Sequence, residues 1–279
     1  MTRGLTRMGL GDVGSNERFV KLAREYGFQA VDLNDVLGWV EAEGKETALA
    51  VLAETGVAIG SIGLPVEWRS TEERFRSDLT KLAATAAAAA ELGCTRCCTY
   101  VLPATDLNAA HFMALATRRL RTCADILGAY GIRFGLEYVG PHHLRTRWAN
   151  PFVWTLDQTN DWIDAIGAPN VGLLLDSYHW YTTGQTADEL AALRADQIVH
   201  VHINDAPDVP VEEALDNGRL YPGEGVIDLP AFLQALQRTG YSGPISQEIL
   251  TQSPPTAPAE ELLSRSKAGF DKVFAAAGL

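Results

Sequence analysis

The chain has 279 residues, 47% of them hydrophobic, which is enough to bury a large core and is close to the length of one α/β barrel. It carries 23 Lys and Arg against 35 Asp and Glu, and the resulting net charge of -12 argues against a nucleic-acid partner, because phosphate binding needs a basic surface. No apolar run approaches the ~20 residues that span a bilayer, and the first residues lack the apolar region of a signal peptide. We therefore expect a cytoplasmic protein with no membrane partner.

Short apolar runs alternate with longer amphipathic segments along the whole chain. In chain order this alternation predicts strand 5–10, helix 16–26, strand 28–33, helix 43–55, strand 57–62, helix 71–92, strand 95–101, helix 107–130, strand 132–137, helix 154–166, strand 170–176, helix 187–193, strand 198–203, helix 229–238, strand 244–248 and helix 257–277. Glycines such as Gly27, Gly56 and Gly93 stand between a helix and the next strand, as the left-handed caps of short loops do.

No linker or change of composition interrupts this alternation. It predicts an α/β fold, a (β/α)8 or TIM barrel, as a single domain over residues 1–279. The alternative is an open doubly wound sheet, which would normally carry a glycine-rich phosphate loop after its first strand. The sequence GLGDVG at residues 9–14 matches that pattern only imperfectly, so we interpret it as an ordinary loop.

The four cysteines are Cys94, Cys97, Cys98 and Cys123, and the first two have the C-x-x-C spacing of a redox or zinc pair. A second such pair and a thioredoxin-like context are both missing. Cys97 and Cys98 also fall within a strand that is predicted to be buried. We therefore interpret the cysteines as core residues.

Acidic or imidazole side chains stand at the ends of the four late strands. Glu137, Asp176 and Glu248 each end a predicted strand, and His202 lies near the end of another. In a barrel these strand ends are neighbours on the carboxyl rim, where ligands bind. A lone acid at a strand end is more often a helix cap or an ion-pair partner, but four such groups in a row favour a metal site. Oxygen and nitrogen ligands without thiolates suit Mn²⁺, Mg²⁺, Co²⁺ or Zn²⁺ rather than structural zinc.

Three further residues stand close to these strand ends. His179 follows Asp176 by three positions, where we expect a loop, and is a candidate for supporting the metal site or binding substrate. Asp205 follows His202 by three positions and is a candidate for orienting that histidine or for binding metal or substrate. His200 points to the same side of its strand as His202 but one layer deeper, which favours packing or support of the site.

Five motifs in the second half of the chain resemble those of one known family. They are GLEYVG around Glu137, LLLDSYHWY around Asp176, HVHINDA around His202, YPGEGVIDL at residues 221–229 and GYSGPISQEIL around Glu248. In this order they look like the late-strand motifs of the sugar phosphate isomerase/epimerase family, the xylose-isomerase-like TIM barrels.

The resemblance implies specific roles for the four strand-end residues. In the epimerases of the family such a quartet holds one divalent metal ion, here expected to be Mn²⁺ first, with Glu137, Asp176, His202 and Glu248 as ligands. The two glutamates also act there as an acid/base pair on opposite faces of the substrate. The expected partner is thus a small carbohydrate-like molecule, and the family often forms homo-oligomers.

The family also suggests the substrate contacts, with one departure. Its epimerases place a substrate-binding arginine shortly after the metal-binding histidine. Here the sixth residue after His202 is Asp208, so that contact is either missing or supplied by Arg219. We expect Arg219, His179 and Asp205 to contact substrate.

One branch of the family consists of nucleases with a trinuclear zinc site, which needs extra histidines from the earlier strands. The predicted third strand ends in Gly60-Ser61-Ile62-Gly63 and the fourth carries Thr99-Tyr100, so neither supplies a histidine. Together with the negative net charge, this argues against the nuclease branch.

The expected chemistry begins with removal of a proton next to a carbonyl group, which a divalent metal assists as a Lewis acid through a metal-stabilised enediolate. Return of the proton to the other face gives an epimerase, and return to the neighbouring carbon gives an isomerase. We therefore predict that the chain is an isomerase or epimerase of a sugar, sugar phosphate or polyol-derived ketone. Loss of a β-hydroxyl would instead make the chain a lyase, either a dehydratase or an eliminating deglycosylase. A barrel that only binds a ligand is the third hypothesis.

Overall fold

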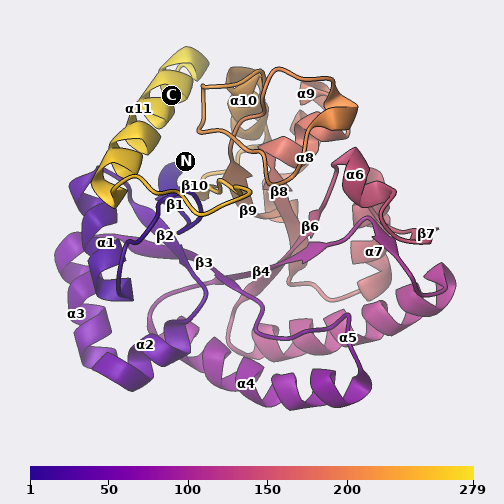
Figure 1. Cartoon of the computed structure of the whole chain (residues 1–279). Coiled ribbons are helices and arrows are strands. Elements are labelled where there is room, and N and C mark those ends of the chain that lie inside the picture. The colour runs from indigo at the N-terminus through magenta and orange to yellow at the C-terminus, as the bar shows by residue number, and fades with distance from the viewer.

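Strands and helices alternate through residues 1–279, all of which the computed structural model describes. Eight parallel strands close into a barrel in the order β1-β10-β9-β8-β6-β4-β3-β2, and helices surround it (Figure 1). The predicted TIM barrel is confirmed. The barrel strands are β1 (Thr2–Leu5), β2 (Ala30–Leu33), β3 (Ala58–Gly63), β4 (Arg96–Val101), β6 (Arg133–Tyr138), β8 (Val171–Asp176), β9 (Ile198–Ile203) and β10 (Pro244–Gln247).

The predicted helices are present with ends shifted by a few residues. Ser15, Thr71 and Thr155 each begin a helix by accepting a backbone N–H with the side-chain oxygen, as N-cap residues do. A small antiparallel pair, β5 (Ala104–Thr105) with β7 (Asn150–Pro151), lies outside the barrel. The helices are α1 (Asn16–Glu25), α2 (Val36–Glu43), α3 (Lys45–Thr55), α4 (Glu72–Glu91), α5 (Ala109–Ala129), α6 (His142–Arg145), α7 (Leu156–Ile166), α8 (Ser177–Thr182), α9 (Ala187–Ala191), α10 (Leu229–Thr239) and α11 (Ala259–Ala277).

One hydrophobic core lies between the barrel and the ring of helices. Strands β8 and β9 are buried at every residue, because one face of each lines the barrel and the other lies under helices. Phe270 of α11 packs edge-on against Phe28, with ring centroids 5.2 Å apart. All four cysteines are free and buried, as expected. No helix has both the length and the apolar character needed to cross a membrane.

The first strand lies earlier than predicted. Residues 5–10 were expected to form it, but β1 covers Thr2–Leu5 and pairs in register with β10 from Pro244 to Gln247. The chain then turns, with positive φ angles of 80° and 65° at Gly9 and Gly11, which only glycine adopts readily. Residues 6–10 therefore belong to the loop over the rim. The spaced apolar residues of this loop imitate the alternation of a strand.

Three short helices were not predicted: α2, α6 and α8. Helix α2 follows β2, and the side chain of Asp35 caps it by accepting the N–H of Gly38. Helix α8 follows β8 directly, so His179 lies on a helix and not in the expected loop. The side chain of Asp176 accepts the N–H of Tyr178 and so caps α8. None of the three segments is long enough for its apolar pattern to show a clear helical period.

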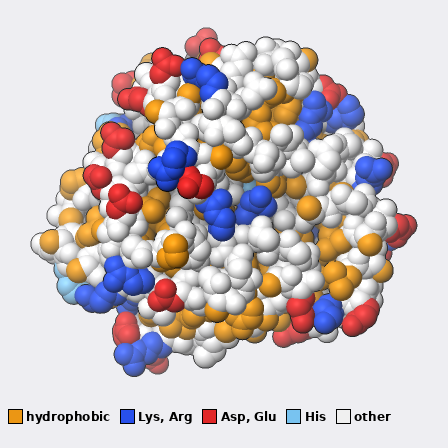
Figure 2. Space-filling view, turned by 180° about the vertical axis from the view of Figure 1, so that it is seen from behind, with side chains coloured by type: hydrophobic (Ala, Val, Ile, Leu, Met, Phe, Trp, Pro, Cys, Tyr) orange, Lys and Arg blue, Asp and Glu red, His pale blue; other side chains and the backbone are white.

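Figure 1 looks onto the carboxyl ends of the strands, where the loops after β1, β9 and β10 lie in front. Figure 2 shows the opposite face, with basic side chains near its centre.

Two arginines join strands at the amino ends of the barrel. Arg96 begins β4 and donates to the carbonyl oxygen of Val199 at 2.9 Å. Arg133 begins β6 and donates to the carbonyl oxygen of Ile198 at 3.0 Å and to that of Asp196. These bonds join β4 and β6 to β9, strands that are not neighbours in the barrel, a structural role typical of this end of a TIM barrel.

Replacement of Arg133 by Met should therefore lower the free energy of unfolding by about 1–3 kcal/mol, since it leaves two carbonyl groups without their donor. Urea denaturation measures this change. Arg238→Met is the matched control, because both contacts of Arg238, the ion pair with Asp188 at 3.1 Å and the bond to the carbonyl oxygen of Ala187 at 3.2 Å, are exposed to solvent. It should change the free energy by less than about 1 kcal/mol. Equal losses in the two variants would contradict a special role for Arg133.

Candidate metal centre

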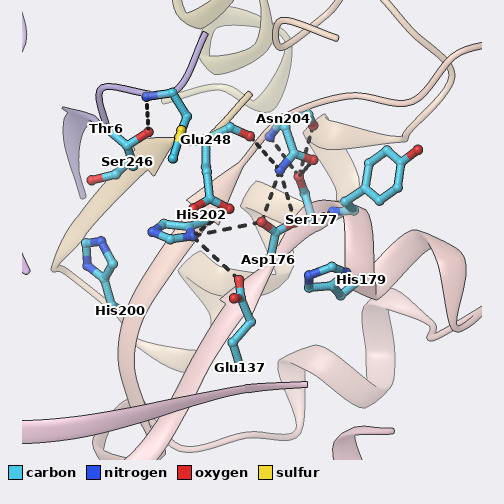
Figure 3. Close-up of polar contacts among 12 residues, drawn as sticks. Thr6, Glu137, Asp176, Ser177, His179, His200, His202, Asn204, Ser246 and Glu248 are labelled. Carbon is cyan, nitrogen blue, oxygen red and sulfur yellow. Dashed lines mark hydrogen bonds and ion pairs between the residues drawn. The ribbon is translucent and has the colours of Figure 1, made fainter. Parts of the chain in front are cut away.

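The four strand-end residues of the late strands converge on one point of the carboxyl rim (Figure 3). Nδ1 of His202 lies 3.5 Å from Oε1 of Glu137, 3.4 Å from Oε2 of Glu248 and 3.9 Å from Oδ2 of Asp176. Each residue offers one ligand atom within 4.8 Å of all the others. The strand register brings them together. Asp176 is the β8 neighbour of His202, and Glu248 follows by two residues Ser246, the β10 neighbour of His202.

Two polar atoms of this cluster are buried without a hydrogen-bond partner, Oε1 of Glu137 and Nδ1 of His202. A buried polar atom without a partner costs free energy, so native proteins rarely leave two such atoms side by side. A divalent ion between them would satisfy both atoms, and three carboxylates with one imidazole suit such an ion. The cluster therefore fits a divalent metal.

Burial and mutual charge shift the pKa values of these residues in opposite directions. Burial raises the pKa of Glu137, and the negative charge of Glu248 adds to this shift. Burial also raises the pKa values of Glu248 and Asp176, but positively charged neighbours lower them by more. His202 and Arg219 lower the pKa of Glu248, and Arg219 with two histidines lowers that of Asp176 to about 2. Burial alone would lower the pKa of His202, but the carboxylates, Glu248 first, raise it well above its usual value.

Arg219 is part of this cluster. Its Nη1 donates to Oδ2 of Asp176 and to Oε2 of Glu248, both at 2.8 Å, and its Nη2 donates to Oδ1 of Asp216 at 2.7 Å. Its side chain is only 1% exposed. Direct substrate binding by Arg219 was expected, but the structure places its guanidinium against the carboxylates. One arginine and one divalent ion would balance the charges of Glu137, Asp176 and Glu248.

His179 packs beside Arg219, with its Nε2 3.4 Å from Nη2 of the arginine. Its Nδ1 lies 3.3 Å from the backbone nitrogen of Gly140, which donates to it. The residue is almost completely buried on α8. The structure thus brings His179 to the edge of the metal centre, at a position that supports Arg219.

The carboxylate of Asp205 binds the backbone of the loop that follows β9. Its carboxylate accepts hydrogen bonds from four backbone N–H groups, those of Ala206, Gly223, Gly225 and Ile227, each at 2.9 Å. These bonds hold the loop after β9 in place and use both carboxylate oxygens. Asp205 was expected to bind substrate or metal, or to orient His202, whereas here both of its carboxylate oxygens accept from backbone N–H groups of its own loop.

Sequence reasoning missed two polar residues of the site. Asn204 follows β9, and its amide nitrogen donates to both carboxylate oxygens of Asp176, at 3.1 and 3.0 Å. Asp32 lies in β2 and contacts both histidines of β9, at 2.8 Å from Nε2 of His200 and 3.3 Å from Nε2 of His202. The signal that would have found Asp32 is the one used for the late strands, an acid close to the end of a predicted strand.

A cavity of about 540 Å³ opens over the half of the rim that β1 to β4 form, and it reaches the metal centre. Glu137, His202 and Glu248 line it, but Asp176 does not. A ligand in the cavity would thus contact the two glutamates and the imidazole. Its other polar lining residues include Thr6, Arg7, Asp32, Asn34, Ser61, Glu67, Arg69, Arg74, Asp78, Thr99 and Tyr100.

The model of the xylose isomerase-like TIM barrel family matches residues 20–268 of this chain. The chain belongs to this family. A solved structure, a xylose isomerase domain protein from Alicyclobacillus acidocaldarius, is 37% identical and superposes over 100% of both chains with a TM-score of 0.91. The fold and the family expected from the late-strand motifs are thus confirmed.

Characterised relatives of the chain carry several enzyme names. An inosose isomerase of Bacillus velezensis is 34% identical over 148 residues, which are 53% of this chain and 50% of the relative. The alignment thus spans about half the length of this relative. A ketose 3-epimerase of Arthrobacter globiformis is 27% identical over 90% of this chain and 83% of its own. A 3-dehydroshikimate dehydratase of Pseudomonas aeruginosa is 31% identical over 52% of this chain and 22% of its own.

Metal binding at neutral pH should release about one proton or more. The raised pKa of His202 keeps its imidazole protonated in the metal-free protein, and a metal can bind Nδ1 only after that proton leaves. Affinity for Mn²⁺ should therefore rise about tenfold per pH unit while His202 remains protonated. Calorimetry in buffers of different ionisation enthalpy counts the protons. His142→Gln, a change at an exposed histidine, should leave the count unchanged. An affinity independent of pH between 6 and 8 would contradict this assignment.

Proposed function

We propose that the chain is a divalent-metal-dependent isomerase or epimerase that acts on a carbonyl compound of the sugar or cyclic polyol type. The observation that carries this proposal is the pair of unpartnered buried atoms, Oε1 of Glu137 and Nδ1 of His202, at the inner end of a cavity of about 540 Å³. A pocket of this size suits a small ligand. Relatives that are named inosose isomerase and ketose 3-epimerase support the reaction class.

In this proposal Glu137, Asp176, His202 and Glu248 hold the ion, with Mn²⁺ the first candidate because most of the ligands are carboxylates. When bound, the ion supplies a Lewis acid beside the substrate carbonyl. The protein residues around it then have separate roles. Asp176 lies outside the cavity, with its oxygens bonded to Arg219 and Asn204, so we assign it to metal binding alone.

Glu137 and Glu248 line the cavity and are therefore the carboxylates that we assign to proton transfer. One glutamate takes the proton from the carbon next to the carbonyl group. The electron pair of that C–H bond forms a carbon–carbon double bond, and the π electron pair of the carbonyl group moves to its oxygen. The other glutamate returns a proton, either to the opposite face of the same carbon or to its neighbour. We place Arg219 and His179 behind the carboxylates, where Arg219 offsets their charge.

The charges of the cavity wall favour a neutral substrate. Arg69 donates to the carbonyl oxygen of Tyr100 at 2.9 Å and pairs with Glu67, and Arg74 pairs with Asp78 at 2.8 Å. The third lining arginine, Arg7, donates to the carbonyl oxygen of Gly14 and to Oδ1 of Asn16. Every guanidinium of the wall is thus already bonded, and the five lining carboxylates outnumber the three arginines, which disfavours an anion. A ketose or an inosose fits this wall better than a sugar phosphate or a carboxylate.

Elimination remains the second candidate reaction. It shares the first step, and it follows when a hydroxyl group leaves from the β carbon before a proton returns. A relative named 3-dehydroshikimate dehydratase favours this candidate, although its aligned region covers only 22% of that protein. The product distinguishes the two reactions, because only elimination releases water and leaves a double bond.

Replacement of Glu248 by Gln should lower kcat by about 10²–10⁴-fold, because the amide cannot accept the proton. The assay is deuterium uptake from D₂O into ketoses and inososes in the presence of Mn²⁺, followed by NMR. Glu91→Gln is the matched control, since Glu91 pairs only with Lys45 on the outer surface, at 3.3 Å. Normal turnover in Glu248→Gln would overturn the acid/base assignment.

The preference for neutral substrates has its own test. For a neutral ketose that exchanges deuterium, kcat/KM should exceed that of its phosphate ester by at least about tenfold, since each unpaired charge in a wall already rich in acids costs more than 1 kcal/mol. The same NMR assay compares the two compounds at equal concentration and ionic strength. A preference for the phosphate ester would refute the substrate class but not the proton-transfer chemistry.

A further inference from the structure

Asp32 is a buried carboxylate beside the metal centre that the proposed proton transfer does not use. It comes from β2, an early strand that only β1 separates from β10 in the closed barrel. Its Oδ2 lies 2.8 Å from Nε2 of His200 and 3.3 Å from Nε2 of His202, and its Oδ1 accepts the hydroxyl group of Ser246 at 3.1 Å. One carboxylate thus joins side chains of β2, β9 and β10.

The two ring nitrogens of His202 face different surroundings. Nδ1 points to three carboxylates and has no hydrogen-bond partner, whereas Nε2 points to Asp32 (Figure 3 shows the Nδ1 side). A neutral imidazole carries its one proton on one nitrogen and offers the other as a ligand. A carboxylate acceptor at Nε2 therefore favours the form in which Nδ1 is free to bind a metal ion.

We infer that Asp32 is a positioning residue that holds His202 with its proton on Nε2 and its Nδ1 aimed at the metal. This inference rests on the proposed metal site. A metal-bound histidine whose second nitrogen is hydrogen-bonded to a carboxylate is both oriented and made more basic, which strengthens its bond to the metal.

His200 has a supporting position in this arrangement. It is completely buried one layer below His202, and the two rings meet edge to face with centroids 5.3 Å apart. Its Nε2 donates to the same Oδ2 of Asp32, at the shorter of the two distances. His200 and Ser246 together hold the carboxylate from both sides, so that it cannot rotate away from His202.

Two glycines, Gly4 and Gly60, leave the space that Asp32 and Ser246 occupy. A Cβ atom added to Gly60 would lie 2.5 Å from Oδ1 of Asp32, and one added to Gly4 would collide with the hydroxyl group of Ser246. Neither glycine has a positive φ angle, so the backbone conformation does not require glycine at these two strand positions. Glycine is required there because a side chain would collide with Asp32 or with Ser246.

A second metal ion among Asp32, His200 and His202 is the competing explanation, since these three residues also offer ligand atoms within reach of one another. Two observations favour the hydrogen bond. The 2.8 Å between Oδ2 and Nε2 of His200 is an ordinary hydrogen-bond length. A second ion would also force His202 to bridge two metals through both nitrogens, which requires the loss of its last proton.

The first test measures Mn²⁺ affinity by electron paramagnetic resonance in wild type, Asp32→Asn and Gly60→Ala. Asp32→Asn keeps the size of the side chain but loses its charge, and its amide can donate to Nε2 and so favour the wrong tautomer. We expect its dissociation constant to rise about 10–100-fold. Gly60→Ala pushes on the carboxylate from the other side and should weaken binding in the same direction. If Asp32→Asn fails to fold, Gly60→Ala still tests the inference.

The control is Arg133→Met, which weakens the barrel at its opposite end and should leave the Mn²⁺ dissociation constant unchanged. Thermal unfolding of the metal-free proteins separates a general loss of stability from a loss of affinity. An Asp32→Asn protein that binds Mn²⁺ as tightly as wild type would overturn the inference while leaving the proposed function intact. A wild-type protein that binds no divalent metal would overturn both.

The second test reads the tautomer directly. Long-range ¹H–¹⁵N NMR of the Zn²⁺-loaded protein should show the His202 proton on Nε2. A proton on Nδ1, or a stoichiometry of two ions that falls to one in Asp32→Asn, would overturn the inference in favour of a different ligand set.

Discussion

The structure depends on one constraint, the burial of three carboxylates within a few ångströms of each other on the barrel rim. Glu137, Asp176 and Glu248 would repel one another strongly in a medium of low dielectric constant. Buried charge persists in proteins only when it is paired or bound to metal. Arg219 supplies one positive charge, and the surrounding carboxylates raise the pKa of His202, which favours a second positive charge on its imidazole. A divalent ion would replace the proton of His202 and neutralise the remaining negative charge of the three carboxylates.

The surroundings of the cluster follow from this constraint. Asn204 donates to both oxygens of Asp176, and Asp205 holds the loop that follows β9 and leads to Arg219. On the far side Asp32 meets the second nitrogen of His202. Each contact limits how far a ligand side chain can turn. The proposed proton transfer needs such rigid placement, because a small error of geometry is costly in rate.

The two ends of the barrel divide their roles. At the amino ends of the strands, Arg96 and Arg133 bond to backbone carbonyl groups and hold β4, β6 and β9 together. At the carboxyl ends, polar side chains face a cavity, and the loops between strands and helices shape its wall. This division separates stability from chemistry, so that changes at one end can leave the other intact.

The sequence by itself determined the order of strands and helices, the barrel, and the four strand-end residues that we propose as the metal centre. These features are local: apolar runs and capping glycines mark where each element ends, and parallel strands in a barrel bring their ends together. Only the tertiary structure decided what the neighbouring polar groups do. Arg219 faces carboxylates, Asp205 holds a loop, and Asp32 meets a histidine 170 positions away. Such contacts depend on how distant elements pack and on how buried charges are neutralised, which no local pattern records.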